Sequence, residues 1–157
     1  HADLIIQETG AADKSTLSHP GGDKEVMEEE SNSKELTRSD ATRFRAVAAR
    51  ANYLAADRPD IQYAVKEVCY RMAKPVEGDW QKLARLGLYL KGAPRCVMEY
   101  QWQQAGENPV GFSDSDWAGD RKTGKSTSGG IIMLGSHLIK TGAGRRMRSR
   151  SARPKQS

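Results

Sequence analysis

The chain has 157 residues, a hydrophobic fraction of 37% and a net charge of +5. This length suits one domain or two small ones and argues against a large independent enzyme. No apolar run approaches the roughly 18 residues that span a bilayer, and no basic segment followed by an apolar one opens the chain. We therefore expect no membrane contact, no signal peptide and an intracellular protein, cytoplasmic or nuclear.

Charge divides the chain into three zones. Residues 1 to 35 carry nine acidic and three basic residues (−6), residues 36 to 120 carry eleven and twelve (+1), and residues 121 to 157 carry none and ten (+10). The acidic start is rich in glycine and serine and has no apolar periodicity, so residues 1–33 are predicted to form a disordered linker. An acidic recognition tail is the alternative interpretation.

A helical region is predicted over residues 34–94. The first helix is expected to be capped by Ser39 or Asp40, the second to start at Pro59, and the third to be capped by Asp79 and to stop before Pro94. Each has one apolar face at helical spacing. The expected buried residues are Phe44, Val47, Ala48, Ala51, Leu54 and Ala55, then Ile61, Ala64, Val65, Val68 and Met72, then Trp80, Leu83, Leu86, Gly87 and Leu90.

Many basic residues lie on these helices and raise the question of a phosphate-binding groove. Acidic residues accompany them, so composition favours a mixed solvated surface over such a groove. The cysteines Cys69 and Cys96 lie far apart without a CxxC pair, which argues against a disulfide framework and against zinc. Both are interpreted as buried thiols.

After Pro94 the apolar period changes towards two, which is typical of strands. Strands are expected over residues 96–102, 110–117, 128–134 and 137–141, with tight turns between them. The fold class is therefore α+β, with a small helical unit followed by an antiparallel sheet.

Two carboxylates lie at the end of the second of these strands. Side chains alternate between the faces of a strand, so Asp114 and Asp116 point the same way, with Ser115 opposite. Mg²⁺ favours paired carboxylates, which repel each other unless a cation or a base accompanies them. A metal site and an ordinary turn neutralised by nearby bases such as Lys125 are the two interpretations.

Four short segments, taken together, resemble the Pol polyproteins of copia-type LTR retrotransposons. In chain order they are residues 53–65 (YLAADRPDIQYAV), residues 74–92 (KP, then W, then YLKG), residues 111–120 (GFSDSDWAGD) and residues 125–129 (KSTSG). The resemblance spans residues 34–141.

The resemblance implies a location within the polyprotein. Residues 34–94 would be the connection-like end of a reverse transcriptase, and residues 95–141 the first strands of an incomplete RNase H-like sheet. It implies Asp114 as a ligand of Mg²⁺ or Mn²⁺ and Asp116 as a second ligand that the family need not use, while Lys125 would contact phosphate or simply shape a turn. The implied partners are an RNA–DNA hybrid or other nucleic acid and the remainder of the Pol polyprotein, and the ancestral activity is cleavage of the RNA strand.

Two departures from the family argue against activity in this chain. No YVDD-like word of a polymerase palm precedes residue 34, and no SSAEAE-like word follows Thr141 to supply a second metal-binding carboxylate. No acidic residue occurs after Asp120, whereas two-metal cleavage needs several carboxylates. We expect a fragment that is inactive alone.

Residues 142–157 are predicted to be a disordered basic tail with five arginines and a lysine. One hypothesis is an out-of-frame reading of the segment that should encode the missing carboxylate. The alternative is a non-catalytic basic nucleic-acid-binding protein, with Arg145, Arg146, Arg148 and Arg150 on phosphates. Without an aromatic residue to stack on bases, such binding would not be sequence-specific.

Overall fold

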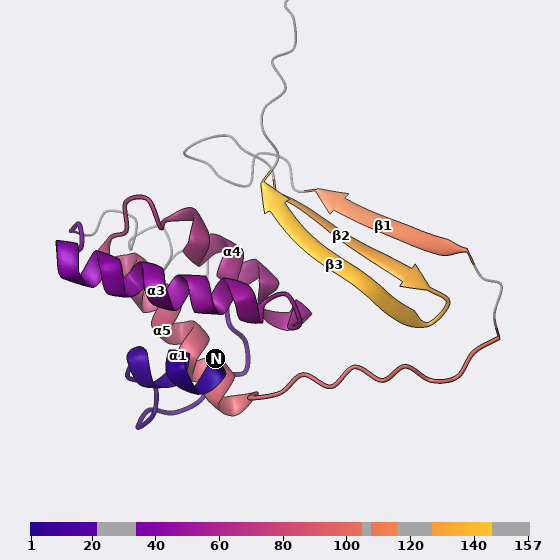
Figure 1. The fold of residues 1–157 in the computed structure, drawn as a ribbon, viewed down its shortest axis with the longest axis horizontal. Coiled ribbons are helices and arrows are strands. Elements are labelled where there is room, and N and C mark those ends of the chain that lie inside the picture. Colours follow the sequence, from indigo (N-terminus) through magenta and orange to yellow (C-terminus); the bar gives the residue numbers. More distant parts are fainter. Residues whose placement is uncertain (22–33, 105–107, 116–126, 146–157) are drawn as a thin grey trace, which may run out of the picture. The chain divides into compact units, whose positions relative to one another are not determined.

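A computed structural model describes residues 1–21, 34–104, 108–115 and 127–145. The chain divides into two compact units, His1–Met98 and Glu99–Ser157. The first unit contains the helices and the second contains a three-stranded antiparallel sheet, an arrangement compatible with the expected α+β class (Figure 1). Within these described ranges, no helix is both long enough and apolar enough to cross a membrane.

The start of the chain differs from the disordered linker expected over residues 1–33. Helix α1 (Ala2–Glu8) buries Ile5 completely, and it contacts α5 (Glu77–Gly92) and α3 (Arg38–Leu54). After α1, the carbonyl oxygens of Ala12 and Lys14 accept from Lys91 Nζ at 2.5 and 2.8 Å. A helix of seven residues is too short to give a periodic apolar signal, which explains why it was missed. Residues 22–33 lie outside the described part.

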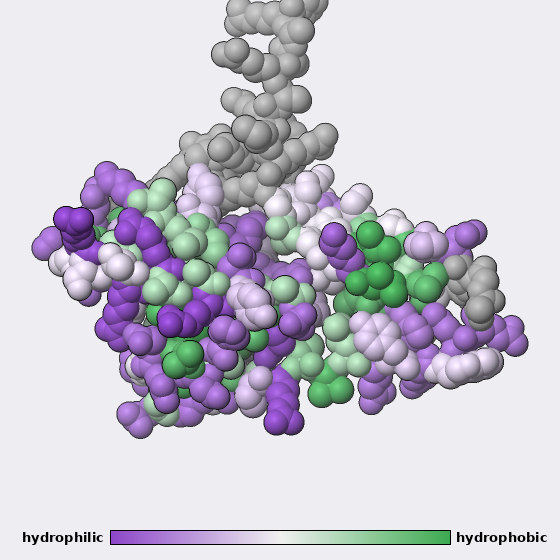
Figure 2. Space-filling model, viewed as in Figure 1, coloured by the Kyte–Doolittle hydropathy of each residue, from purple (hydrophilic) through white to green (hydrophobic). Residues whose placement is uncertain are grey.

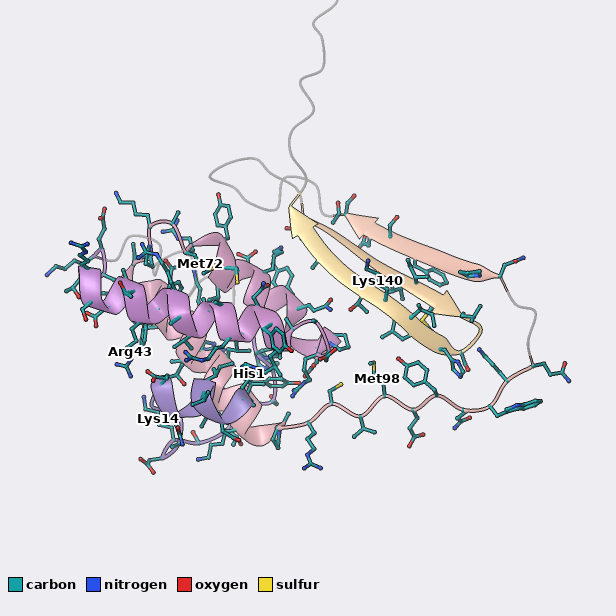
Figure 3. The ribbon with its side chains drawn as sticks, in the orientation of Figure 1. His1, Lys14, Arg43, Met72, Met98 and Lys140 are labelled. Carbon is teal, nitrogen blue, oxygen red and sulfur yellow. The ribbon has the colours of Figure 1, made fainter. Side chains whose placement is uncertain are left out.

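Polar contacts also fasten α1 to α3. Arg43 donates from Nε to Glu8 Oε2 at 2.8 Å and from an Nη to the Glu8 carbonyl oxygen at 2.9 Å. The ring of His1 lies 4.8 Å from that of Tyr53, and Arg43 extends from α3 on the side of α1 (Figure 3). On α5, a Cβ added at Gly87 would overlap the Thr9 hydroxyl, so this close approach requires glycine.

Helix α3 (Arg38–Leu54) begins two or three residues before the expected start. Thr37, and neither Ser39 nor Asp40, is its N-cap: the Thr37 hydroxyl accepts from the Asp40 amide at 3.2 Å and donates to the Asp40 carboxylate at 2.7 Å. The predicted face is confirmed, since Phe44, Val47, Ala48, Ala51 and Ala55 are buried.

The next two helices follow as predicted, with one change at a cap. A 3₁₀ turn, η1 (Pro59–Ile61), leads into α4 (Gln62–Tyr70), and α5 (Glu77–Gly92) follows the residue pair Lys74-Pro75. The N-cap of α5 is Val76. Asp79 lies in the first turn, where its carboxylate accepts from the Val76 amide at 3.0 Å. Asp79 thus satisfies the helix start from inside the helix.

The apolar faces of these helices meet in a single core. Its buried members come from α1, α3, α4 and α5 and from the segments beside them, and they are Ile5, Phe44, Val47, Ala48, Ala51, Ala55, Ile61, Val65, Val68, Leu83, Leu86 and Leu90. Trp80 packs against this core, with its ring 6.3 Å from that of Phe44. The helical unit therefore holds together through shared burial.

The sheet has the order β1-β2-β3. Strands β1 (Pro109–Ser115), β2 (Thr127–Leu134) and β3 (His137–Arg145) pair in antiparallel fashion, with a register shift at Ile132/Met133. Gly135, with φ of 56°, forms the tight turn between β2 and β3. Residues 142–145 were expected in the disordered tail, but they extend β3 and pair with residues 127–130.

The strand expected over residues 96–102 is absent, since these residues lie in neither helix nor strand. Their alternation does not correspond to burial, because Met98, Tyr100 and Trp102, on the expected apolar face, are 41%, 53% and 87% exposed. Side chains of this segment instead bind the β2–β3 hairpin. Tyr100 donates to the Leu138 carbonyl at 2.9 Å, and Gln103 donates to that of Leu134 at 2.8 Å.

The docking of α1 gives a first prediction. Ile5→Ala should lower the free energy of unfolding by about 2 to 5 kcal/mol, because it opens a cavity in the core. Leu4→Ala, at a side chain that is 45% exposed, should change it by less than about 0.5 kcal/mol. Urea unfolding followed by circular dichroism measures both. Equal effects of the two substitutions would contradict the docking of α1.

Candidate metal and nucleic-acid sites

Asp114 lies near the end of β1. Its Cα is paired with that of Gly129 on β2, which is paired in turn with Ala143 on β3. The carboxylate shares a sheet face with Phe112, and Ser115 lies on the other face. Asp114 is exposed and makes no hydrogen bond or ion pair with any residue that the structure describes. A Cβ added at Gly129 would meet nothing within 4 Å, so the surface beside the carboxylate is open.

The described residues do not complete a metal centre around Asp114. Asp116 lies outside them, and within them no group of three or more histidine, cysteine, aspartate or glutamate side chains is placed to hold a metal ion. Mg²⁺ or Mn²⁺ needs several oxygen ligands, and a two-metal site needs carboxylates on either side of the scissile phosphate. Asp114 alone fits the role of one ligand and does not form a catalytic centre.

Most of the predicted nucleic-acid contacts lie outside the described residues. These are Lys125, Arg146, Arg148 and Arg150. Arg145 is the last residue of β3, and only its backbone is described. The basic tail and the segment between β1 and β2 therefore remain sequence-based predictions.

Basic residues of the helical unit bind the chain itself. Arg45, for example, donates to the carbonyl oxygens of Met72 and Ala73 at 2.8 and 3.3 Å, just after α4. The other basic side chains with an acceptor in the same unit are Arg43, Arg58, Lys66, Arg71, Lys74, Lys82, Arg85 and Lys91. Side chains held in this way are not free to line a phosphate groove, so the mixed-surface interpretation is favoured.

Arg58 and Asp60, within the RPD word, form a partly buried ion pair. The guanidinium donates from Nε and from an Nη to the carboxylate at 2.9 and 2.7 Å, and its Nη also donates to the Ala93 carbonyl at 2.8 Å, after α5. Tyr89 donates from its hydroxyl to Asp60 Oδ2 at 2.8 Å. The pair thus ties η1 to the C-terminal end of α5.

The pKa values of this network follow from its contacts. Burial acts to raise the pKa of Asp60, but the hydrogen bonds from Arg58 and Tyr89 and the guanidinium charge outweigh it, and the net shift is downward. The hydrogen bond to Asp60 raises the pKa of Tyr89, and the same carboxylate raises that of Arg58. The charged pair and the neutral phenol are therefore the favoured forms.

A second buried carboxylate, Asp79, also has a structural role. It is 1% exposed and accepts from Arg71 Nε at 3.1 Å and Lys82 Nζ at 3.3 Å, besides the Val76 amide. The Asp79 carboxylate oxygens thus bind the backbone at the start of α5 and two basic side chains of the same unit. No substrate is needed to explain its burial.

His137 and Cys69 have structural explanations. His137 accepts from Gln103 Nε2 at 3.2 Å through Nδ1 and donates from Nε2 to the Gln101 carbonyl at 2.5 Å, which leaves no nitrogen for a catalytic partner. Burial raises the pKa of the Cys69 thiol, as for an unreactive cysteine. Cys96 was expected to be buried but is exposed, because the residues around it form no strand.

Comparison with known proteins relates the chain to retrovirus-related Pol polyproteins. It is similar to the Pol polyproteins of two Arabidopsis thaliana transposons, RE1 (38% identity over 103 residues) and RE2 (36% over 102), with 64% of this chain and 7% of each polyprotein covered. It is also similar to an uncharacterised mitochondrial protein of the same plant, 39% identical over 106 residues, which are 68% of this chain and 44% of that protein.

These similarities confirm that the chain resembles part of a retrotransposon Pol polyprotein, without specifying which part. The chain spans under half of the mitochondrial relative and a small part of each Pol polyprotein, so it corresponds to a segment of them. No family model matches the chain, and no solved structure matches it significantly.

The ion pair of Arg58 and Asp60 gives a second prediction. Asp60→Asn should lower the free energy of unfolding at neutral pH by about 2 to 3 kcal/mol, because it leaves a buried guanidinium without its counter-charge. The pKa of Asp60 is lowered on folding from 3.8, so its contribution is complete above that pH and is lost as the pH falls through the folded value. The difference between wild type and variant should therefore shrink below about pH 4.

Asp57→Asn, at an exposed neighbour of the pair, is the matched control and should leave stability unchanged at every pH. Urea titrations between pH 2.5 and 7 measure all three proteins. A difference between wild type and Asp60→Asn that stays constant across this range would contradict the role of the ionised carboxylate.

Proposed function

We propose that the chain is a fragment of a retrotransposon Pol polyprotein from the junction of reverse transcriptase and RNase H. In this proposal residues 34–94 are the connection-like end of the reverse transcriptase and residues 95–141 begin an RNase H-like sheet. The order of the four family-like words supports it, as does the succession of a helical unit and an antiparallel sheet. The similarity to the RE1 and RE2 polyproteins supports the wider context.

The position of Asp114 supports an ancestral role in metal-dependent cleavage of RNA in RNA–DNA hybrids. Its carboxylate is exposed near the end of a strand, beside the open surface over Gly129, and has no partner among the described residues that would explain it structurally. A bound Mg²⁺ or Mn²⁺ would supply the Lewis acid and the activated water. Because no acidic residue follows Asp120 to supply further metal ligands, the proposal includes no cleavage by this chain on its own.

A third prediction tests the absence of activity. The full chain, incubated with an RNA–DNA hybrid labelled on the RNA and with Mg²⁺ or Mn²⁺, should cleave no faster than its Asp114→Asn variant. Ser115→Ala, on the opposite face of β1, is the matched control: it is prepared in the same way, so it shows how much cleavage comes from contaminating nuclease. Cleavage that is present in wild type and Ser115→Ala but lost in Asp114→Asn would overturn the proposed inactivity and would support the descent.

Non-catalytic nucleic-acid binding is the second candidate function, and it rests on the basic tail. Residues 142–157 contain six basic residues and no acidic one, whereas nine basic side chains of the helical unit have acceptors within that unit. Such a tail neutralises phosphates without reading bases. The tail is therefore the part of the chain to which binding is assigned.

A fourth prediction follows from this assignment. Five basic residues follow β3. Replacing them with glutamine or serine should abolish most binding to a hybrid or duplex and lower the slope of log affinity against log salt by about 4. The end of β3 stays intact in this variant, unlike in a deletion from residue 142. Fluorescence anisotropy between 50 and 300 mM salt measures the slope, and an unchanged slope would rule out the tail as the binding element.

A further inference from the structure

The sheet buries no apolar side chain among its described residues. Every buried hydrophobic residue in the described part belongs to residues 1–98, whereas Val110, Phe112 and Ile131 are 49%, 57% and 40% exposed. Hydrophobic residues are visible at the surface of the strands (Figure 2). A sheet of three strands without a covered face is at best marginally stable, so further contacts are expected at its surface or its edges.

Apolar residues of neighbouring strands lie opposite one another in two rows. The register places Phe112 opposite Ile131, and Ile131 opposite Thr141. Val110 is opposite Met133, which is opposite Leu138. Residues directly opposite each other in an antiparallel pair share a face, so these two rows run across one face of the sheet to its β1 edge.

The two edges of the sheet differ. Beside β3, residues 100–103 already bind, since Tyr100 donates to the Leu138 carbonyl and His137 to that of Gln101. The outer edge of β1 has no hydrogen-bond partner anywhere in the described ranges. It also lacks the usual protection of an edge, because Asp114 is its single charge and Pro109, its first residue, is its single proline.

We infer that β1 pairs with β1 of a second copy of the chain, in antiparallel orientation, with Phe112 on the two-fold axis. Phe112 is the central residue of β1, so this register pairs the whole strand. Ser113 then lies opposite Gly111 of the other copy, and Asp114 opposite its Val110. The two sheets become one sheet of six strands without a free β1 edge.

Charge and apolar surface both favour this self-pairing. The two Asp114 carboxylates lie on opposite sides of the axis, so like charges are not placed opposite each other. The row from Thr141 through Ile131 to Phe112 continues into the same row of the second copy, which places the two phenyl rings side by side. A second copy is therefore the partner whose strand matches the edge in length, charge and apolar pattern.

A fifth prediction tests the pairing through the residue on the axis. The full-length wild-type chain should sediment as a dimer at micromolar concentration, while Phe112→Lys and Phe112→Glu should each sediment as monomers, because like charges meet at the axis. Mixing the two variants should restore a dimer through the lysine–glutamate pair. This recovery also shows that each variant is folded. A wild type that is monomeric at all concentrations, or variants that remain dimeric, would overturn the inference.

Cysteine cross-linking tests the register. In a chain with Cys69→Ser and Cys96→Ser, Phe112→Cys should form a disulfide-linked dimer, since residues opposite each other in an antiparallel pair lie within disulfide range. Ser113→Cys, displaced from the axis and on the other face, should form none. A mixture of Val110→Cys and Asp114→Cys should form the mixed disulfide. Equal cross-linking of the Ser113 and Phe112 variants would contradict pairing through this edge.

Discussion

Burial of apolar side chains between the helices is the interaction on which the described structure depends. Helix α1 contributes Ile5, α3 contributes Phe44, α4 contributes Val65, and α5 contributes Leu83 and Leu86, all fully or almost fully buried. Helices α1 and α4, of 7 and 9 residues, are too short to be stable alone in water, and longer helices such as α3 and α5 also gain most of their stability from packing. The sheet has no comparable core in the residues described. Stability is therefore concentrated in the helical unit, and the sheet depends on contacts beyond its own side chains.

Charged residues reinforce the same unit. Arg58 and Asp60 connect η1 to the end of α5, and Asp79 connects the start of α5 to Arg71 and Lys82. One of the segments that resemble Pol polyproteins, residues 53–65, thus stabilises the interior of the helical unit. Its arginine and aspartate need no substrate to explain them, since a buried guanidinium requires a counter-charge.

Much of the helical unit could be predicted from the sequence, because a one-sided apolar stripe leaves a repeating signal. The faces of α3, α4 and α5 were predicted correctly, although Leu54, Ala64, Met72 and Trp80 are partly buried where full burial was expected. Helix α1 was missed since its docking depends on one buried isoleucine and on hydrogen bonds to distant residues. The segment around Trp102 was predicted as a strand because alternation reports side-chain direction and carries no information about a hydrogen-bonded neighbour.

The candidate site shows the same limit of sequence reasoning. The alternation of a strand correctly predicts that Asp114 and Ser115 point to opposite faces, but it cannot supply ligands that approach from elsewhere in a fold. A metal centre is a property of several segments brought together, whereas Asp114 faces Gly129 and Ala143, which have no oxygen on their side chains. The register therefore places no oxygen ligand directly opposite the carboxylate. A carboxylate-rich metal centre would need ligands from outside the described strands, and for that reason the proposed descent from a nuclease does not imply present catalysis.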